Sequence, residues 1–138
     1  MEAGYVAGYS RAVLTFAALF CSIATEASAH ARLKRASPPV GGIVSVETVP
    51  SELQIWFSER VEPSLSDIQV VNAAGARVDN GGLRLDETDP TELHLALQPL
   101  RPGRYRVVWR VVSVDTHKTN GTFPFRVRPK GRAGLTNR

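Results

Sequence analysis

Short runs of alternating apolar and polar residues recur along the chain beyond residue 30, separated by turn-forming residues. No segment there keeps the period of an amphipathic helix, whereas a period of two is typical of half-buried strands. The pattern predicts an all-β sandwich or barrel of about seven strands. The expected strands cover residues 31–36, 53–57, 67–71, 82–85, 92–97, 104–112 and 122–128.

The same alternation predicts the core, because residues two apart in a strand face the same side. Trp56 and Trp109 are interpreted as packing residues, and Tyr105 is placed in the core. Turn residues fall between the strands, at 38–42, 72–75, 80–82, 89–90 and 101–103. The four predicted core rows are Leu53, Ile55 and Phe57; Leu93, Leu95 and Leu97; Tyr105, Val107, Trp109 and Val111; and Phe123, Phe125 and Val127.

Residues 1–29 have the features of an export signal. Residues 12–24 are almost uninterrupted apolar, and Ala27, Ser28 and Ala29 fit the small-residue cleavage pattern. A retained membrane anchor is the alternative, but the run is shorter than the roughly 20 apolar residues needed to span a bilayer. We therefore expect cleavage before His30, one domain over residues 30–129, and a basic disordered tail over 130–138.

Composition limits the chemistry of the mature chain. The single cysteine is Cys21 and the single methionine is Met1, so cleavage would leave neither a disulfide nor a soft metal ligand. Cleavage would also raise the formal charge from +4 to +5, since one basic and two acidic residues leave. The basic residues are dispersed along strands, which favours a solvated sheet face over nucleic-acid binding. We expect a monomer without a nucleic-acid partner.

A metal site is predicted from the position of His30. At a free N-terminus, its α-amine and imidazole can close one chelate ring around a metal ion. Asp115 and His117 are separated by one residue, so in an extended backbone their side chains project to the same side, with Cα atoms roughly 6.5–7 Å apart. Three nitrogens and one carboxylate suit the tetragonal geometry of Cu(II). Zn(II) could use the same atoms in a tetrahedral arrangement.

Alternative interpretations remain for the individual histidines. An Asp-x-His on a loop is common as a turn former beside a surface histidine, so that motif alone is weak. It gains weight from the histidine at the predicted cleavage point. His94 stands between Leu93 and Leu95 and is expected to be an exposed histidine on the outer sheet face.

Three segments together resemble the CopC family of periplasmic copper-binding proteins. The first is H-A-R-L-K-R-A-S-P-P-V-G-G from His30, which is similar to the family's mature N-terminus. The second is L-Q-I-W-F-S-E-R-V-E-P from Leu53. The third runs from Tyr105 to Val127 and contains V-D-T-H-K-T-N, where the family's Asp-x-His supplies two Cu(II) ligands.

This resemblance implies an immunoglobulin-like Greek-key sandwich with Cu(II) ligated by His30, Asp115 and His117. It also implies a membrane partner of the CopD type, and it suggests Glu59 as a carboxylate that orients a ligand, although a solvated loop position is the competing interpretation. The chain departs from the family pattern in two places. No methionine-rich Cu(I) site is present, and Thr116 stands where many members carry Gly.

The predicted function is therefore copper sequestration, resistance or delivery in the periplasm, without catalytic turnover. One rival is a copper monooxygenase of the histidine-brace kind, which Asp115 disfavours because a carboxylate would fill a position needed for oxygen chemistry. A second rival is a metal-free immunoglobulin-like structural module, for which the sandwich alone would suffice.

Overall fold

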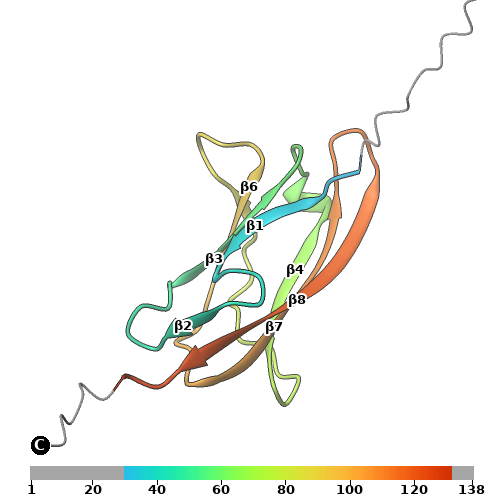
Figure 1. Cartoon of the computed structure of the whole chain (residues 1–138). Helices are drawn as coiled ribbons and strands as arrows, with labels where there is room; N and C mark the ends of the chain where they lie inside the picture. Colours follow the sequence, from blue (N-terminus) through green and yellow to red (C-terminus); the bar gives the residue numbers. More distant parts are fainter. Residues whose placement is uncertain (1–29, 132–138) are drawn as a thin grey trace, which may run out of the picture.

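The computed structural model describes residues 30–131, which form two packed β-sheets (Figure 1). The predicted signal (1–29) and most of the predicted tail (130–138) lie outside the described residues. No helix in the described part is long and apolar enough to cross a membrane. The elements are β1 (Leu33–Ser37), β2 (Ile43–Ser45), β3 (Glu52–Phe57), the 3-10 helix η1 (Pro63–Leu65), β4 (Asp67–Asn72), β5 (Arg84–Leu85), β6 (Glu92–Ala96), β7 (Gly103–Val112) and β8 (Lys118–Arg128).

The strand order confirms the predicted sandwich. One sheet runs β1-β3-β6-β5 and the other runs β2-β8-β7-β4. In immunoglobulin notation the first sheet is A-B-E-D. In the second sheet, β4, β7 and β8 correspond to strands C, F and G. All pairs are antiparallel except β2 with β8, which is parallel. The fold is therefore all-β and immunoglobulin-like in its connections.

All seven expected strands are present, and β2 is an eighth that the pattern did not predict. This strand has only three residues, Ile43–Ser45, and pairs at the edge of its sheet with residues 126–128 of β8. A run this short carries no measurable alternation, and its pairing depends on a segment more than 80 positions away. Tertiary contacts, not local pattern, therefore decide its conformation.

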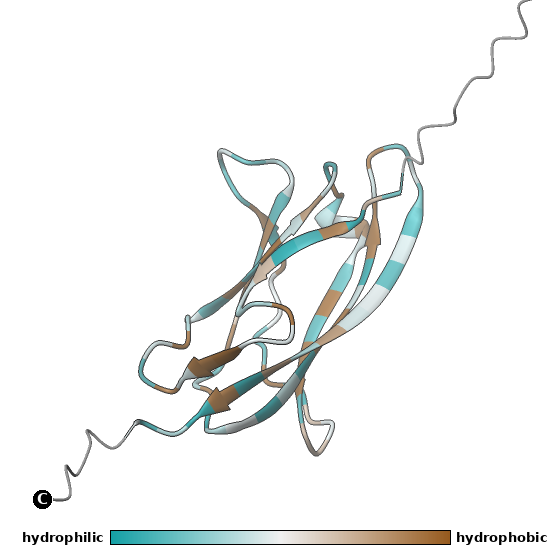
Figure 2. Cartoon of the chain, viewed as in Figure 1, coloured by the Kyte–Doolittle hydropathy of each residue, from teal (hydrophilic) through white to brown (hydrophobic). Residues whose placement is uncertain are grey.

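The four predicted rows form the core, as expected. Every one of their members is buried, and all belong to one continuous cluster. Figure 2 shows the alternation as brown segments interleaved with pale and teal ones along the strands. Trp109 packs edge-on against Phe57 from the facing sheet, with ring centroids 5.2 Å apart. This aromatic contact joins the sheets near the end of β3.

Tyr105 fixes the entry into β7. Its hydroxyl donates a hydrogen bond of 2.7 Å to the carbonyl of Arg101, and its ring stacks on Phe125 with centroids 5.3 Å apart. A tyrosine that bonds back to the chain just before this strand is the tyrosine corner of immunoglobulin-like sandwiches. The long β7–β8 hairpin therefore starts from a fixed point in the core.

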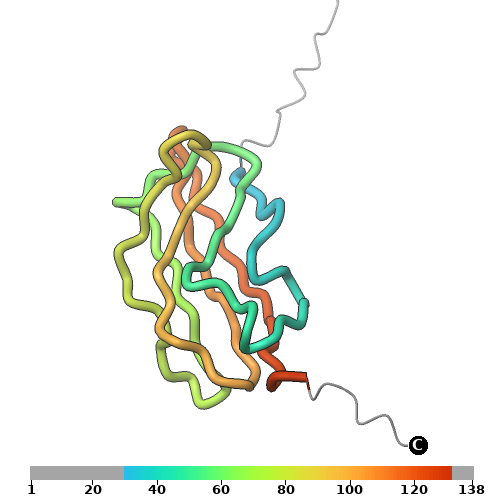
Figure 3. Tube along the Cα trace, turned by 90° about the vertical axis from the view of Figure 1, so that its left-hand side faces the viewer, coloured from blue at the N-terminus to red at the C-terminus, as the bar shows by residue number. Residues whose placement is uncertain are grey.

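The described chain starts and ends at opposite poles of the sandwich. Figures 1 and 3 both show the blue start beside one end of the sheets and the red end of β8 at the other. The turn between β7 and β8 lies at the same pole as the blue start (Figure 1). Topology therefore brings His30 and the Asp115–His117 segment to one end of the molecule.

Gly121 is expected to be irreplaceable because it lies under Trp109. The two residues are paired across β7 and β8, and a Cβ at Gly121 would come within 2.4 Å of the indole. Gly121→Ala should lower the free energy of unfolding by about 1–3 kcal/mol in urea titrations. Gly131→Ala, where a Cβ meets nothing within 4 Å, is the control and should leave stability unchanged. Equal stability of the two variants would contradict this packing.

Candidate metal centre

The connection from β7 to β8 is a tight turn closed by Ser113. The backbone N–H of Ser113 donates to the carbonyl of His117 at 3.0 Å, and the N–H of Thr116 donates to the carbonyl of Ser113 at 2.8 Å. The ladder of β7 and β8 ends just before this turn, at the Val112–Lys118 pair. Asp115 and His117 therefore lie on a closed loop at the pole of the sandwich.

Asp115 and His117 do not lie in the extended backbone that we expected. Thr116 between them has φ of 71°, in the left-handed region that β-branched residues rarely adopt. The extended geometry was wrong, but the two side chains still meet: Oδ2 of Asp115 lies 2.9 Å from Nδ1 of His117. Gly adopts this conformation without steric cost, whereas a β-branched threonine does not.

Asp115 is held in its ionised form. The Ser113 hydroxyl donates a short hydrogen bond to Oδ1 of Asp115, and His117 contacts Oδ2. The bond from Ser113, followed by that from His117, keeps the pKa of Asp115 below its ordinary value. The carboxylate is consequently a permanent negative charge beside an imidazole at neutral pH.

His30 lies against this pair. Its ring centroid is 5.0 Å from that of His117, and the ring planes are inclined by 54°. Metal–nitrogen bonds of about 2.0–2.1 Å allow one ion to bridge rings at this separation. The structure therefore brings together the three residues predicted as metal ligands, from opposite ends of the described chain.

Three anchors that the sequence did not reveal fix the first residues in place. Ser58 accepts a hydrogen bond from the N–H of Arg32 at 2.9 Å and donates to the carbonyl of His30 at 3.5 Å. The hydroxyl of Thr119, on β8, donates to the carbonyl of Ala31 at 2.9 Å. Ala31 itself is 1% exposed. These bonds join segments far apart in the sequence, so no local pattern predicts them.

Two further sequence interpretations concern Glu59 and His94. Glu59 is half-buried in the turn after β3, and its role as an orienting carboxylate stays a prediction. His94 was expected to be exposed, which is wrong: it is only 7% exposed. Its ring is covered by carboxylates from Glu52, Asp86 and Glu92, which lie within 3.0–3.2 Å of its nitrogens. The alternation correctly predicted that His94 projects from the outer face of its sheet. It could not show that neighbouring side chains cover the ring there.

Comparison with known proteins now identifies the family. The model of the CopC domain matches residues 33–128 of this chain. The chain belongs to the CopC family. Asp115 and His117 lie inside the matched span, whereas His30 precedes it by three residues. The resemblance noted in the sequence is confirmed over nearly the whole described domain.

Individual CopC relatives agree with this assignment. Protein YobA of Escherichia coli K12 is 32% identical, covering 87% of this chain and 93% of its own. Copper resistance protein C of Pseudomonas syringae pv. tomato is 28% identical, over 83% and 95%. Copper transport protein CutJ of Bacillus subtilis is 31% identical over 72% of this chain but only 18% of its own. The crystal structure of CopC from Methylosinus trichosporium OB3b superposes with a TM-score of 0.67 at 31% identity, covering 76% of this chain and 100% of that one.

Membership in the CopC family also confirms the broad functional class. The family consists of copper-binding proteins without catalytic turnover, in agreement with the prediction of a copper protein that is not an enzyme.

The acid behaviour of Asp115 provides a direct test of the Ser113 contact. Because the folded pKa is lowered, Asp115 adds stability above its ordinary pKa, and this is lost as pH falls through the folded value. Ser113→Ala should raise the Asp115 pKa toward the ordinary value, measured by NMR titration of the carboxyl carbon. Ser64→Ala, an exposed serine, is the control. An unchanged Asp115 titration in Ser113→Ala would show that the hydroxyl does not set it.

Proposed function

We propose that this protein is exported, begins at His30 after cleavage, and binds one Cu(II) ion in the periplasm. The ligands are the α-amine and imidazole of His30, the carboxylate of Asp115 and the imidazole of His117. In this role the protein sequesters copper or delivers it to a membrane copper transport protein of the CopD type. The observation that carries the proposal is the meeting of His30 with the Asp115–His117 pair at one pole.

The spacing of the donors supports a four-coordinate planar ion. Two adjacent ligands at about 2.0 Å from a metal in a square plane are about 2.8 Å apart. The 2.9 Å between Oδ2 of Asp115 and Nδ1 of His117 is close to this value. Nitrogen and carboxylate donors suit Cu(II), and residues 30–131 contain neither cysteine nor methionine for Cu(I).

The charge at the pole also supports binding of a cation. Asp115 is ionised, so the site has an anionic donor before any metal arrives. Both side chains remain accessible, with 37% of Asp115 and 48% of His117 exposed. An open site of this kind allows an ion to be taken up and passed on, as expected of a carrier.

The delivery role is supported by one relative. Copper transport protein CutJ is a much longer chain, of which the region similar to this protein makes up 18%. A CopC-like domain therefore occurs within a protein named for copper transport. We propose that this protein passes copper to a separate membrane chain in the periplasm.

The two rival functions make different predictions in solution. A histidine-brace monooxygenase would consume peroxide and yield oxidised oligosaccharide with ascorbate; the ionised Asp115 beside His117 disfavours this chemistry. A metal-free structural module would show no visible or EPR signal on titration with Cu(II). The proposed copper carrier gives the spectrum and no oxidised product.

The terminal amine can be tested by adding one residue. A glycine placed ahead of His30 moves the amine out of the chelate ring, while the same glycine placed after Arg138 is the matched control. We expect at least a 10-fold loss of first-equivalent Cu(II) affinity in the first case, since even outer-shell groups contribute roughly 10- to 100-fold. The Cu(II) affinity of each variant is measured by competition titration followed by EPR. Equal affinities would exclude the terminal chelate.

The anchors of residues 30–32 should matter without being ligands. Ser58→Ala and Thr119→Val remove hydrogen bonds that position His30, so each should weaken Cu(II) binding by up to about 10-fold while leaving the EPR parameters unchanged. Ser64→Ala and Thr122→Val, exposed positions of the same residue types, serve as controls. An altered EPR spectrum would instead indicate direct coordination by a hydroxyl.

A further inference from the structure

A second histidine–carboxylate cluster lies away from the candidate copper site, on the outer face of the β1-β3-β6-β5 sheet. His94 is in the middle of β6, paired with Gln54 of β3 on one side and Arg84 of β5 on the other. Its side chain is 8% exposed, although it projects from the solvent side of the sheet. Glu52, Asp86 and Glu92 contribute the surrounding carboxylates.

One ring nitrogen of His94, Nδ1, has a hydrogen-bond partner. Nδ1 lies 3.0 Å from Oε2 of Glu52, and Arg84 in turn contacts both oxygens of Glu52 at 3.1 Å. These contacts hold the Glu52 carboxylate against the Nδ1 edge of the His94 ring. Glu52 therefore occupies the Nδ1 edge of the ring, and an imidazole that donates from Nδ1 to Glu52 presents Nε2 as its ligand atom.

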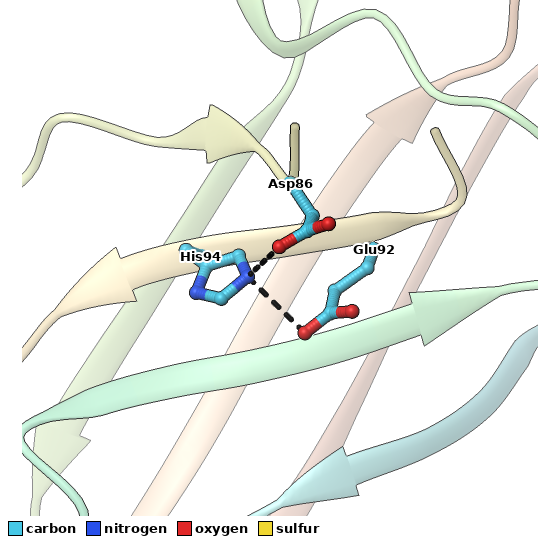
Figure 4. A group of neighbouring side chains, drawn as sticks. All are labelled: Asp86, Glu92 and His94. Carbon is cyan, nitrogen blue, oxygen red and sulfur yellow. Dashed lines mark ion pairs between the residues drawn. The ribbon is translucent and has the colours of Figure 1, made fainter. Parts of the chain in front are cut away.

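The other nitrogen is buried without a hydrogen-bond partner. Nε2 of His94 makes no hydrogen bond of good geometry among the described residues, yet it lies 3.2 Å from Oδ2 of Asp86 and 3.1 Å from Oε1 of Glu92. Figure 4 shows the ring edge directed at these two carboxylates. Two carboxylate oxygens this close to an imidazole nitrogen require a cation between them, which is either a proton on Nε2 or a metal ion.

Both carboxylates are fixed by other contacts. Oδ1 of Asp86 accepts the N–H and the hydroxyl of Thr88 and the N–H of Asp89, which leaves Oδ2 directed at His94. These three bonds fix the orientation of the Asp86 carboxylate. Glu92 accepts a hydrogen bond of 3.1 Å from Gln54. The negative charges are thus held in place by groups that are not themselves ligands.

We propose that Asp86, Glu92 and Nε2 of His94 form a second metal site, for a divalent transition ion of the Zn(II) type. Ligands about 2.0–2.1 Å from a tetrahedral ion are about 3.3 Å apart, close to the two contacts of Nε2. All three ligand atoms lie within 4.8 Å of one another. One nitrogen and two carboxylates leave a fourth position for water.

Glu52 completes the arrangement as the partner of the ligating histidine. A metal-bound imidazole usually donates its other N–H to a carboxylate, which fixes the ring and strengthens the ligand. The Arg84–Glu52–His94 chain supplies this contact before any metal binds. Asp86, with 26% of its side chain exposed, provides the route by which the ion enters.

This second site is independent of the proposed copper function. None of its ligands is at the N-terminus, so it should bind metal whether or not the chain is cut before His30. The two sites can therefore be tested separately, and failure of one leaves the other intact.

The test uses the full chain with the candidate copper site disabled by His30→Ala and His117→Ala. Titration with Zn(II) in a calorimeter should show one equivalent bound. Adding Asp86→Asn or Glu92→Gln should weaken Zn(II) binding by at least about 10-fold. Each substitution removes an anionic ligand while keeping the shape of the side chain. Asp67→Asn, an exposed carboxylate on the other sheet, is the matched control. Circular dichroism melts show that each variant is folded.

Nitrogen NMR of His94 gives a second readout. Zn(II) should shift Nε2 and leave Nδ1 protonated. Three results overturn the proposal: no bound equivalent of Zn(II), equal affinity in Asp86→Asn and the Asp67→Asn control, or a His94 ring protonated on both nitrogens and unaffected by Zn(II). The last would mean that the cation among the carboxylates is only the imidazolium itself.

Discussion

The position of His30 depends on hydrogen bonds that cross from the first described residues to two different strands. Ser58 at the end of β3 and Thr119 on β8 hold the backbone of residues 30–32, and Ala31 is buried between them. A chain terminus would otherwise be free to sample many conformations, at a large entropic cost on binding. These bonds offset that cost in the folded domain, before any ligand is present.

Hydroxyl donors stabilise the ionised form of a carboxylate at both histidine clusters. Ser113 bonds to Asp115, and Thr88 bonds to Asp86; in each case this is the largest cause of a lowered carboxyl pKa. The second oxygen of each carboxylate then faces a histidine nitrogen. The same arrangement, a hydroxyl that donates to a carboxylate beside an imidazole, therefore occurs at Asp115 on the pole and at Asp86 on the outer sheet face.

Local pattern determined the layers, while contacts between distant segments determined the details of the sites. Core rows such as Leu53–Ile55–Phe57 follow from alternation alone. The side chains of Asp115 and His117 meet as expected, but on a turn and not in the extended backbone from which their spacing was interpreted. The conformation of Thr116, the burial of His94 and the role of Ser58 did not follow from local pattern. The conformation of Thr116 depends on the closure of its turn by Ser113. The burial of His94 and the role of Ser58 depend on distant segments, namely β3 and the start of the described chain. Strand β2 was missed for the same reason.

The separation of the two ends of the sandwich has a consequence for orientation. Residue 30 lies at one pole and the end of β8 at the other (Figures 1 and 3). Any surface or protein joined to the chain beyond β8 would hold the domain at that pole. The opposite pole, with His30 and His117, would then face away from the point of attachment. A receiver joined at that end would need a flexible connection to fold back, whereas a separate receiver could approach the pole directly.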